Sequence, residues 1–200
     1  MKIINEYYHI YNRGAHKSLI FLDKSDYDRF WALLYIANSK KPLPKNWFKE
    51  KEWPNILDRN ILVDIFSYCL MPNHYHLGLF EVEKDGIRRF THKLVTAYTM
   101  YFNKKYNHPG TIFQGRYKYK HVNDDKYFNI LLQYIHLNPY GVIEPDLLNT
   151  AKVDYLEEAI TFSKEYEYSS FKDYLGIKRV QNNILSIRGS NLGLQTDQTR

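Results

Sequence analysis

Several short segments of this chain show the residue pattern of β-strands. Strands are expected at residues 7–12, 61–69, 74–81 and 113–122. Residues 61–69 are almost entirely apolar, as in a buried central strand, and a turn at residues 72–73 leads into residues 74–81 as the antiparallel return. Along residues 113–122, basic and aromatic side chains alternate, so this strand is expected to have one basic face.

Two segments between these strands space their apolar residues as amphipathic helices do. One helix is expected to begin near Ser25, with Asp28 completing its capping box, and to end before Pro42; the other begins at Gly86. The resulting order, β-α-β-β-α-β, is that of a ferredoxin-like α+β fold, an antiparallel sheet backed by two helices. The other face of the sheet is then free to hold a ligand.

The rest of the chain predicts further helices, a connection and a tail. A third helix is expected to begin near residues 123–125, whose acidic side chains suit a helix start, and to end before Pro139. Residues 156–165 predict another helix, whereas residues 39–59 lack a clear period and indicate a long connection. We expect one domain over residues 1–176 and a polar, loosely ordered tail over 177–200.

Basic residues are concentrated in one part of the chain, which has a net charge of +6. Residues 87–121 contain eight of the 28 Lys and Arg residues, three His and none of the 22 Asp and Glu residues. Such a segment indicates a polyanionic partner, and the tyrosines and phenylalanines between the charges favour single-stranded nucleic acid, whose bases can stack on rings. A solvated basic face over an aromatic core is the alternative interpretation.

Other features limit the class of protein. No apolar stretch reaches about 18 residues, and residues 1–6 lack the apolar region of a secretory signal, so we expect a cytoplasmic protein without membrane contact. The single cysteine, Cys69, cannot form an internal disulfide or a multi-cysteine zinc site. No Walker-type loop is present, so no nucleotide cofactor is expected.

Two histidines, His74 and His76, stand two residues apart on the strand expected at residues 74–81. Side chains at this spacing share one face of a strand, so both imidazoles can converge on one ion, while Tyr75 and Leu77 point into a core on the other side. A structural role is the more common one for such a pair, and a metal site is the functional interpretation.

Tyr134 and Asn138 are one turn apart on the same face of the expected third helix. Two imidazoles and one amide oxygen leave positions for phosphate oxygens and water, a set that suits Mg²⁺ or Mn²⁺ better than structural zinc. A metal that polarises a phosphodiester, next to a tyrosine that attacks it, is sufficient for covalent strand cleavage. The chain has 19 tyrosines, however, and this pattern alone does not select one of them.

Several motifs in one order resemble a known family of enzymes. The sequence MPNHYH at residues 71–76 resembles the His-hydrophobic-His motif of the HUH endonuclease superfamily, and YIHLNP at residues 134–139 resembles the nucleophile helix of its single-tyrosine transposases. The most similar group is the REP-associated tyrosine transposases. Further similar segments are YHIYNRG at 8–14, FQGRYK at 113–118, YSSF at 168–171 and YLG at 174–176. The resemblance covers about residues 7–176, with Gly78 in place of the usual larger aliphatic residue.

This resemblance implies a metal-dependent transposase. It implies His74 and His76 as metal ligands, Asn138 as a polar group that completes the metal site, and Tyr134 as the nucleophile. The substrate would be a hairpin of single-stranded DNA, cut near its foot to leave a 5′-phosphotyrosine and a 3′-hydroxyl, with Mg²⁺ or Mn²⁺ as cofactor. A monomer and a homodimer both remain open. The candidates for phosphate contacts are Arg88, Arg89, Lys93, Arg116, Lys118 and Lys120.

Two other functions remain as alternatives. A hairpin-binding regulatory protein, acting on DNA or RNA, would bind without cutting, although the intact set of candidate residues argues against it. A structural zinc protein would need more ligands near His74 and His76 than the sequence offers. His136, two residues after Tyr134, points away from that hydroxyl on a helix and is expected to pack or to support the site.

Overall fold

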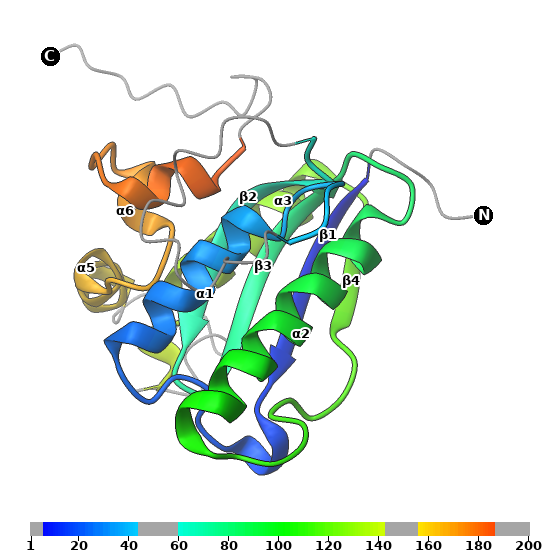
Figure 1. The fold of residues 1–200 in the computed structure, drawn as a ribbon. Helices are drawn as coiled ribbons and strands as arrows, with labels where there is room; N and C mark the ends of the chain where they lie inside the picture. Colours follow the sequence, from blue (N-terminus) through cyan, green and yellow to red (C-terminus); the bar gives the residue numbers. More distant parts are fainter. Residues whose placement is uncertain (1–5, 44–59, 143–155, 187–200) are drawn as a thin grey trace, which may run out of the picture.

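The computed structural model describes residues 6–43, 60–142 and 156–186 (Figure 1). Four strands form its sheet: β1 (Tyr7–Arg13), β2 (Val63–Met71), β3 (His74–Glu81) and β4 (Lys118–Val122). The α-helices are α1 (Lys24–Ile36), α2 (Gly86–Tyr106), α3 (Asp125–Leu137), α5 (Leu156–Glu165) and α6 (Phe171–Tyr174). Short 3₁₀ helices are η1 (Ala15–Lys17), η4 (Tyr140–Val142) and η6 (Val180–Ile184). The predicted order β-α-β-β-α-β and the additional third helix are confirmed.

The sheet is antiparallel throughout, with the strand order β2-β3-β1-β4. This order is that of the ferredoxin-like unit, and it confirms the predicted α+β fold class. Because β1 lies between β3 and β4, the first strand of the chain brings the His74–His76 strand and the basic strand together. In the register, Tyr11 pairs with His76 on one side and with Lys118 on the other.

Helices cover both faces of the sheet. Helices α1 and α2 lie in front of it in Figure 1, over the main core, to which the sheet contributes side chains such as Ile10, Tyr75 and Leu77. Helix α3 lies behind the sheet and packs Phe128 and Ile135 against a smaller apolar cluster on the opposite face. Successive strand residues alternate between these faces, so the position that follows a core residue faces α3.

An irregularity in β2 explains why residue 78 is a glycine. The register between β2 and β3 shifts between Ile65 and Ser67, which turns Phe66 towards the α3 face. The Phe66 ring then lies over Gly78, where a Cβ would come within 2.3 Å of Cε2 of that ring. Glycine is therefore required here by the close approach of Phe66, whose ring fills the space of a larger side chain.

The segment after α5 closes the free edge of β2. The backbone N–H of Leu70 donates to Tyr168 O, and that of Ser170 donates to Tyr68 O. Further on, η6 places Ile184 in the main core with no exposed surface. The part of the expected tail that the structure describes, residues 177–186, is thus packed on the domain, whereas residues 187–200 lie outside the described residues. The division at residue 176 stays a prediction.

The start of helix α1 was predicted two residues too far along the chain. Helix α1 is capped by Asp23, whose carboxylate accepts from the backbone of Asp26 in a capping box, two residues before the expected pair of Ser25 and Asp28. Asp26 is the second residue of this capping box. It is fully buried and also forms an ion pair with Lys105 on α2. The expected connection at 39–59 lies outside the described residues except for residues 39–43.

Candidate active site

The histidines predicted to act together lie on the face of β3 that α3 covers. His74 Nδ1 donates to Asn73 Oδ1 at 2.6 Å, so in the neutral imidazole its Nε2 carries the free lone pair. This Nε2 lies 3.2 Å from Asn138 Oδ1, just past the end of α3. The two atoms lie within hydrogen-bonding distance of each other, and both belong to groups that bind divalent cations.

His76 is held by a third histidine, His9 of β1. His9 Nε2 lies 2.8 Å from His76 Nδ1, and both side chains are buried. If His76 donates from Nδ1, its Nε2 is free to bind a ligand, and metal-binding histidines are commonly oriented by such a bond. The sequence reasoning missed His9, because nothing in residues 8–14 indicates which residue of β3 would lie opposite.

Tyr134 of α3 completes the cluster. Its ring centre is 5.4 Å from that of His76 and 5.7 Å from that of His9. Tyr134, His74 and His76 line one hollow of about 310 Å³. The structure therefore brings together all four residues predicted from the sequence, with Asn138 one turn beyond Tyr134.

Burial sets the protonation states in this hollow. Burial lowers the pKa of His76 well below its usual value, with further lowering by His74 and His9, and burial also lowers the pKa of His74. Both imidazoles are thus neutral at pH 7, the state that binds metal ions. Burial raises the pKa of Tyr134, which hydrogen bonding to Asn138 lowers in part, so the phenol keeps its proton at this pH.

The donor set fits a small divalent cation. Two ligands at right angles around an ion, each about 2.1 Å away, are about 3 Å apart, close to the distance between His74 Nε2 and Asn138 Oδ1. Among the described residues, no group of three or more His, Cys, Asp or Glu side chains is placed to hold a metal. A cation here would therefore use Asn138 beside the two histidines, with water or phosphate oxygens at the open positions.

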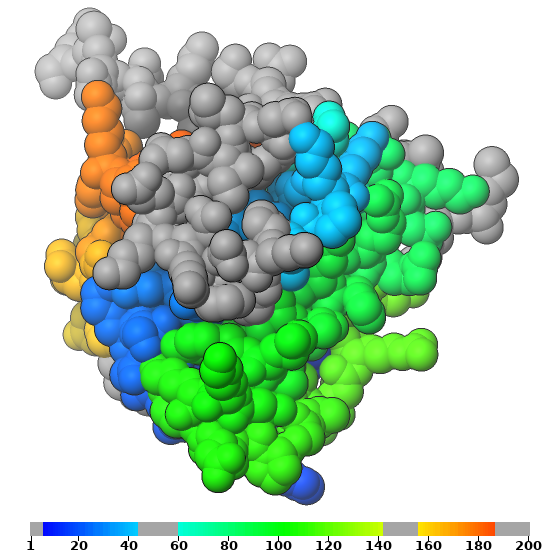
Figure 2. Space-filling view, in the orientation of Figure 1, coloured from blue at the N-terminus to red at the C-terminus, as the bar shows by residue number. Residues whose placement is uncertain are grey.

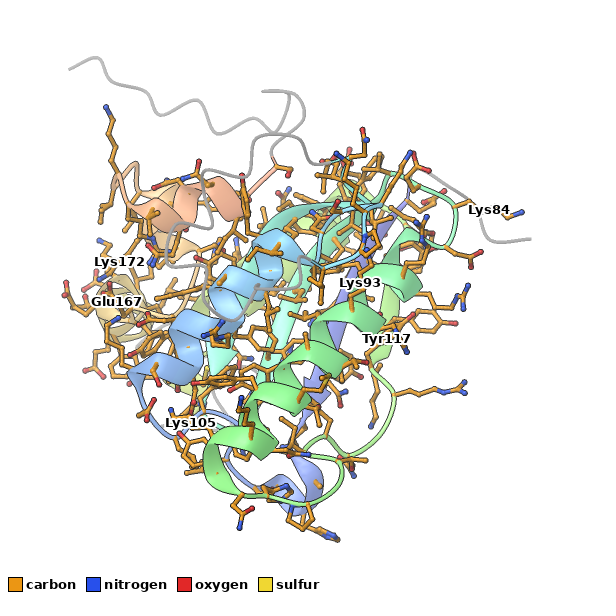
Figure 3. All side chains as sticks on the ribbon, viewed as in Figure 1. Lys84, Lys93, Lys105, Tyr117, Glu167 and Lys172 are labelled. Carbon is orange, nitrogen blue, oxygen red and sulfur yellow. The ribbon has the colours of Figure 1, made fainter. Side chains whose placement is uncertain are left out.

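The six candidate phosphate-binding residues divide between two surfaces. Lys118 and Arg116 line the hollow with Tyr134, and Lys120 lies 4.5 Å from the centre of the Tyr127 ring on the same face. The other three lie on α2, on the opposite face of the sheet: Arg88, Arg89 and Lys93. Figure 3 labels Lys93, whose ammonium donates to the carbonyl groups of Ser39 and Lys41 at 2.5 and 2.6 Å.

His136 anchors α3 rather than lining the hollow. Its Nε2 lies 2.9 Å from Ser170 Oγ, which also accepts from the backbone N–H of Tyr68 at 2.9 Å. The imidazole stacks on Phe171 with ring centres 5.2 Å apart. His136 thus has the packing role that was expected. Its contacts with Ser170 and Phe171 connect α3 to β2.

Comparison with known protein families identifies the chain. The model of the family described as "Transposase IS200 like" matches residues 33–138, more than half of the 200 residues. The chain belongs to the IS200-like transposase family. The match includes the histidine pair, Tyr134 and Asn138, and it ends at Asn138.

A solved structure has the same fold as this IS200-like transposase. It is described as a REP-associated tyrosine transposase bound to a REP hairpin, and it aligns with a TM-score of 0.53 over 90% of this chain and 87% of its own. The two sequences are 12% identical, so the likeness concerns the fold. A search of curated proteins finds no match. No helix within the described residues is long and apolar enough to cross a membrane.

The buried His136 predicts a specific dependence of stability on pH. Burial lowers its pKa from 6.5 to about 3, so the unfolded chain binds a proton below pH 6.5 while the folded protein does not. Stability that is present above pH 6.5 is therefore lost as the pH falls towards 3. Between pH 7 and pH 5 this residue should lower the free energy of unfolding by about 2 kcal/mol.

Chemical denaturation of the wild type and of His136→Gln at both pH values checks this prediction. Glutamine does not titrate, so the free energy of unfolding of His136→Gln should fall by about 2 kcal/mol less than that of the wild type between pH 7 and pH 5. His108→Gln, at an exposed histidine, is the control and should lose as much as the wild type. Equal losses in all three proteins would contradict the prediction.

Proposed function

We propose that this IS200-like transposase is a metal-dependent endonuclease and strand transferase that acts on hairpins of single-stranded DNA. The observation that carries the proposal is the position of Tyr134 in one hollow with His74 and His76, next to Asn138. These residues supply a nucleophile and a site for Mg²⁺ or Mn²⁺ within one chain.

The chemistry assigned to Tyr134 is a transesterification. Its hydroxyl oxygen attacks the scissile phosphorus, the bond from phosphorus to the 3′ oxygen breaks, and the phenol gives up its proton as the 3′ oxygen gains one. The products are a 5′-phosphotyrosine and a free 3′-hydroxyl. A second 3′-hydroxyl reverses the reaction, so joining needs no nucleotide cofactor. A divalent metal bound at the histidines would polarise the phosphodiester and stabilise its developing charge.

The residues around Tyr134 have separate tasks in this proposal. His74, His76 and Asn138 hold the cation, and His9 orients His76 through its hydrogen bond. Lys118 and Arg116, on the wall of the hollow, offset the charge of the DNA backbone. A hairpin as substrate is supported by the family and by the fold of a protein that is described as bound to a REP hairpin.

The first prediction of this function concerns the nucleophile. Tyr134→Phe should abolish the covalent adduct between protein and labelled hairpin DNA, with hairpin affinity unchanged within about twofold, because only the attacking oxygen is lost. Tyr11→Phe is the matched control, since Tyr11 lines the same hollow and should leave the adduct. The measurement is denaturing electrophoresis after incubation with Mg²⁺ or Mn²⁺.

An adduct that persists in Tyr134→Phe would remove Tyr134 from this role. Specific hairpin binding by the wild type without any adduct in either metal would instead support the alternative of a non-cleaving hairpin-binding protein.

The second prediction concerns His9. His9→Leu should weaken Mn²⁺ binding by about ten- to a hundredfold, because His76 loses the acceptor that fixes its ring. His9→Gln should restore most of the affinity, since its amide oxygen can accept where Nε2 did. Titration of free Mn²⁺ by electron paramagnetic resonance, without DNA, measures this directly. Equal affinities in His9→Leu and wild type would show that the hydrogen bond does not support metal binding.

The third prediction concerns Lys118. Lys118→Gln should weaken hairpin binding and reduce the slope of log affinity against log salt concentration by about 0.7 to 0.9, as expected for one lost phosphate contact. Lys164→Gln, on the surface of α5, should leave the slope unchanged. Fluorescence anisotropy at several salt concentrations gives both slopes, and an unchanged slope in Lys118→Gln would place this residue outside the DNA contact.

A further inference from the structure

The turn between β2 and β3 is held by the segment that follows β1, residues 14–21. Pro72 O accepts from the backbone N–H of Ile20 at 2.8 Å, and Asn73 O accepts from that of Gly14 at 2.8 Å. In Figure 2 the blue atoms at the lower tip of the molecule belong to this segment. The turn that leads into the histidine strand is therefore fixed by a part of the chain that is distant in sequence.

This segment has an unusual backbone at His16 and Lys17. Their φ angles are 52° and 64°, in the left-handed region that residues other than glycine seldom adopt. The backbone N–H of Lys17 donates to Gly14 O at 3.1 Å, which helps to keep the conformation. Strain of this kind persists only where the surroundings determine the conformation, and here it directs the carbonyl group of Lys17 at the side chain of Asn73.

The amide of Asn73 connects this carbonyl group with His74. Asn73 Nδ2 donates to Lys17 O at 3.3 Å, and Asn73 Oδ1 lies 2.6 Å from His74 Nδ1. On the other side of the ring, His74 Nε2 lies 3.2 Å from Asn138 Oδ1. A neutral imidazole carries one N–H, so it can donate to only one of these two amide oxygens.

Two arrangements of protons would satisfy His74. In the first, its Nδ1 donates to Asn73 Oδ1 and its Nε2 keeps a lone pair. In the second, the Asn73 amide is turned over, so that Asn73 Nδ2 donates to Nδ1 of the histidine, and Nε2 donates to Asn138 Oδ1. The second would place Asn73 Oδ1 against Lys17 O, and both are acceptors without a proton to share. The carbonyl group of Lys17 therefore favours the first arrangement.

We propose that Asn73 is a positioning residue, which relays the constraint from Lys17 O to His74 and keeps the Nε2 lone pair of this histidine free for a cation. The group that accepts from the other ring nitrogen of a metal-binding histidine fixes its tautomer and its orientation. Residues 14–21 thus prepare the metal site, although none of them lines the hollow at Tyr134. This inference rests on the proposed function, because it concerns a ligand of the same cation.

The first test locates the proton on His74 in the absence of metal. In long-range proton–nitrogen NMR spectra at pH 7, wild-type His74 should have a protonated Nδ1 and an unprotonated Nε2. In Asn73→Leu the proton should move to Nε2, because Asn138 Oδ1 is then the acceptor within reach. Asn73→Asp keeps an acceptor oxygen and should keep the proton on Nδ1. A purely structural role of Asn73 in the turn would not move this proton.

The second test measures Mn²⁺ affinity by electron paramagnetic resonance, without DNA. Asn73→Leu should weaken binding by about ten- to a hundredfold, whereas Asn73→Asp should not weaken it. Lys17→Pro should also weaken binding, because proline fixes φ at about −65° and cannot adopt the φ of 64° found here. Lys17→Gly is the matched control. Glycine adopts a positive φ readily and keeps the carbonyl group, so the affinity should stay within about twofold of wild type.

The outcomes separate this inference from the proposed function. A proton that stays on Nδ1 in Asn73→Leu, or equal Mn²⁺ affinities in Asn73→Leu and wild type, would overturn the relay. Equal affinities in Lys17→Pro and Lys17→Gly would overturn the part assigned to Lys17. Circular dichroism and thermal unfolding establish that each variant is folded before it is compared. Failure of the wild type to bind Mn²⁺, with its proton on Nδ1, would instead overturn the metal site of the proposed function.

Discussion

The candidate site depends on the docking of α3 against the face of the sheet opposite α1 and α2. His74 and His76 are fixed by β3, but Tyr134 and Asn138 reach them only if α3 lies across that face in one position. Apolar contacts through Phe128 and Ile135 pack the helix against the sheet. Because the hydrophobic effect is not directional, these contacts alone do not fix the orientation of the helix. The hydrogen bond from His136 through Ser170 to β2 adds a directional constraint, two residues from Tyr134 on the same helix.

Much of the fold could be predicted because it depends on local patterns, and the spacing of His74 and His76 on a strand indicates that they share a face. The choice of Tyr134 among 19 tyrosines rests instead on the resemblance to a known family. Strand β3 and helix α5 have the predicted bounds, since alternation and helical spacing determine both. Strand β4 begins at Lys118 rather than at residue 113. Residues 113–117 instead form a turn at Gly115, whose carbonyl oxygen accepts a hydrogen bond from Asn12 of β1. His9 and this turn were missed for one reason: their contacts depend on strand register, which no single segment of the sequence states.

The same burial that organises the site also limits its unaided chemistry. Neutral histidines are ready to hold a cation, but the raised pKa of Tyr134 leaves a phenol that is a poor nucleophile at pH 7. Of the described side chains around it, none is an ionised carboxylate placed to take its proton. In the proposed function, a cation held by His74 and His76, together with Lys118, would supply positive charge near the hydroxyl and favour the loss of its proton.

The division of the basic residues between two faces restricts how DNA can lie on the protein. Lys118 and Lys120 belong to the α3 face, and Arg88 and His92 to the opposite face, so a straight backbone cannot contact both groups. Arg116 lines the hollow at Tyr134 and also a second hollow that α2 borders. Among the described residues, it is the only Lys or Arg that lines both. A substrate that contacts both groups must therefore pass around the edge of the sheet that β4 forms.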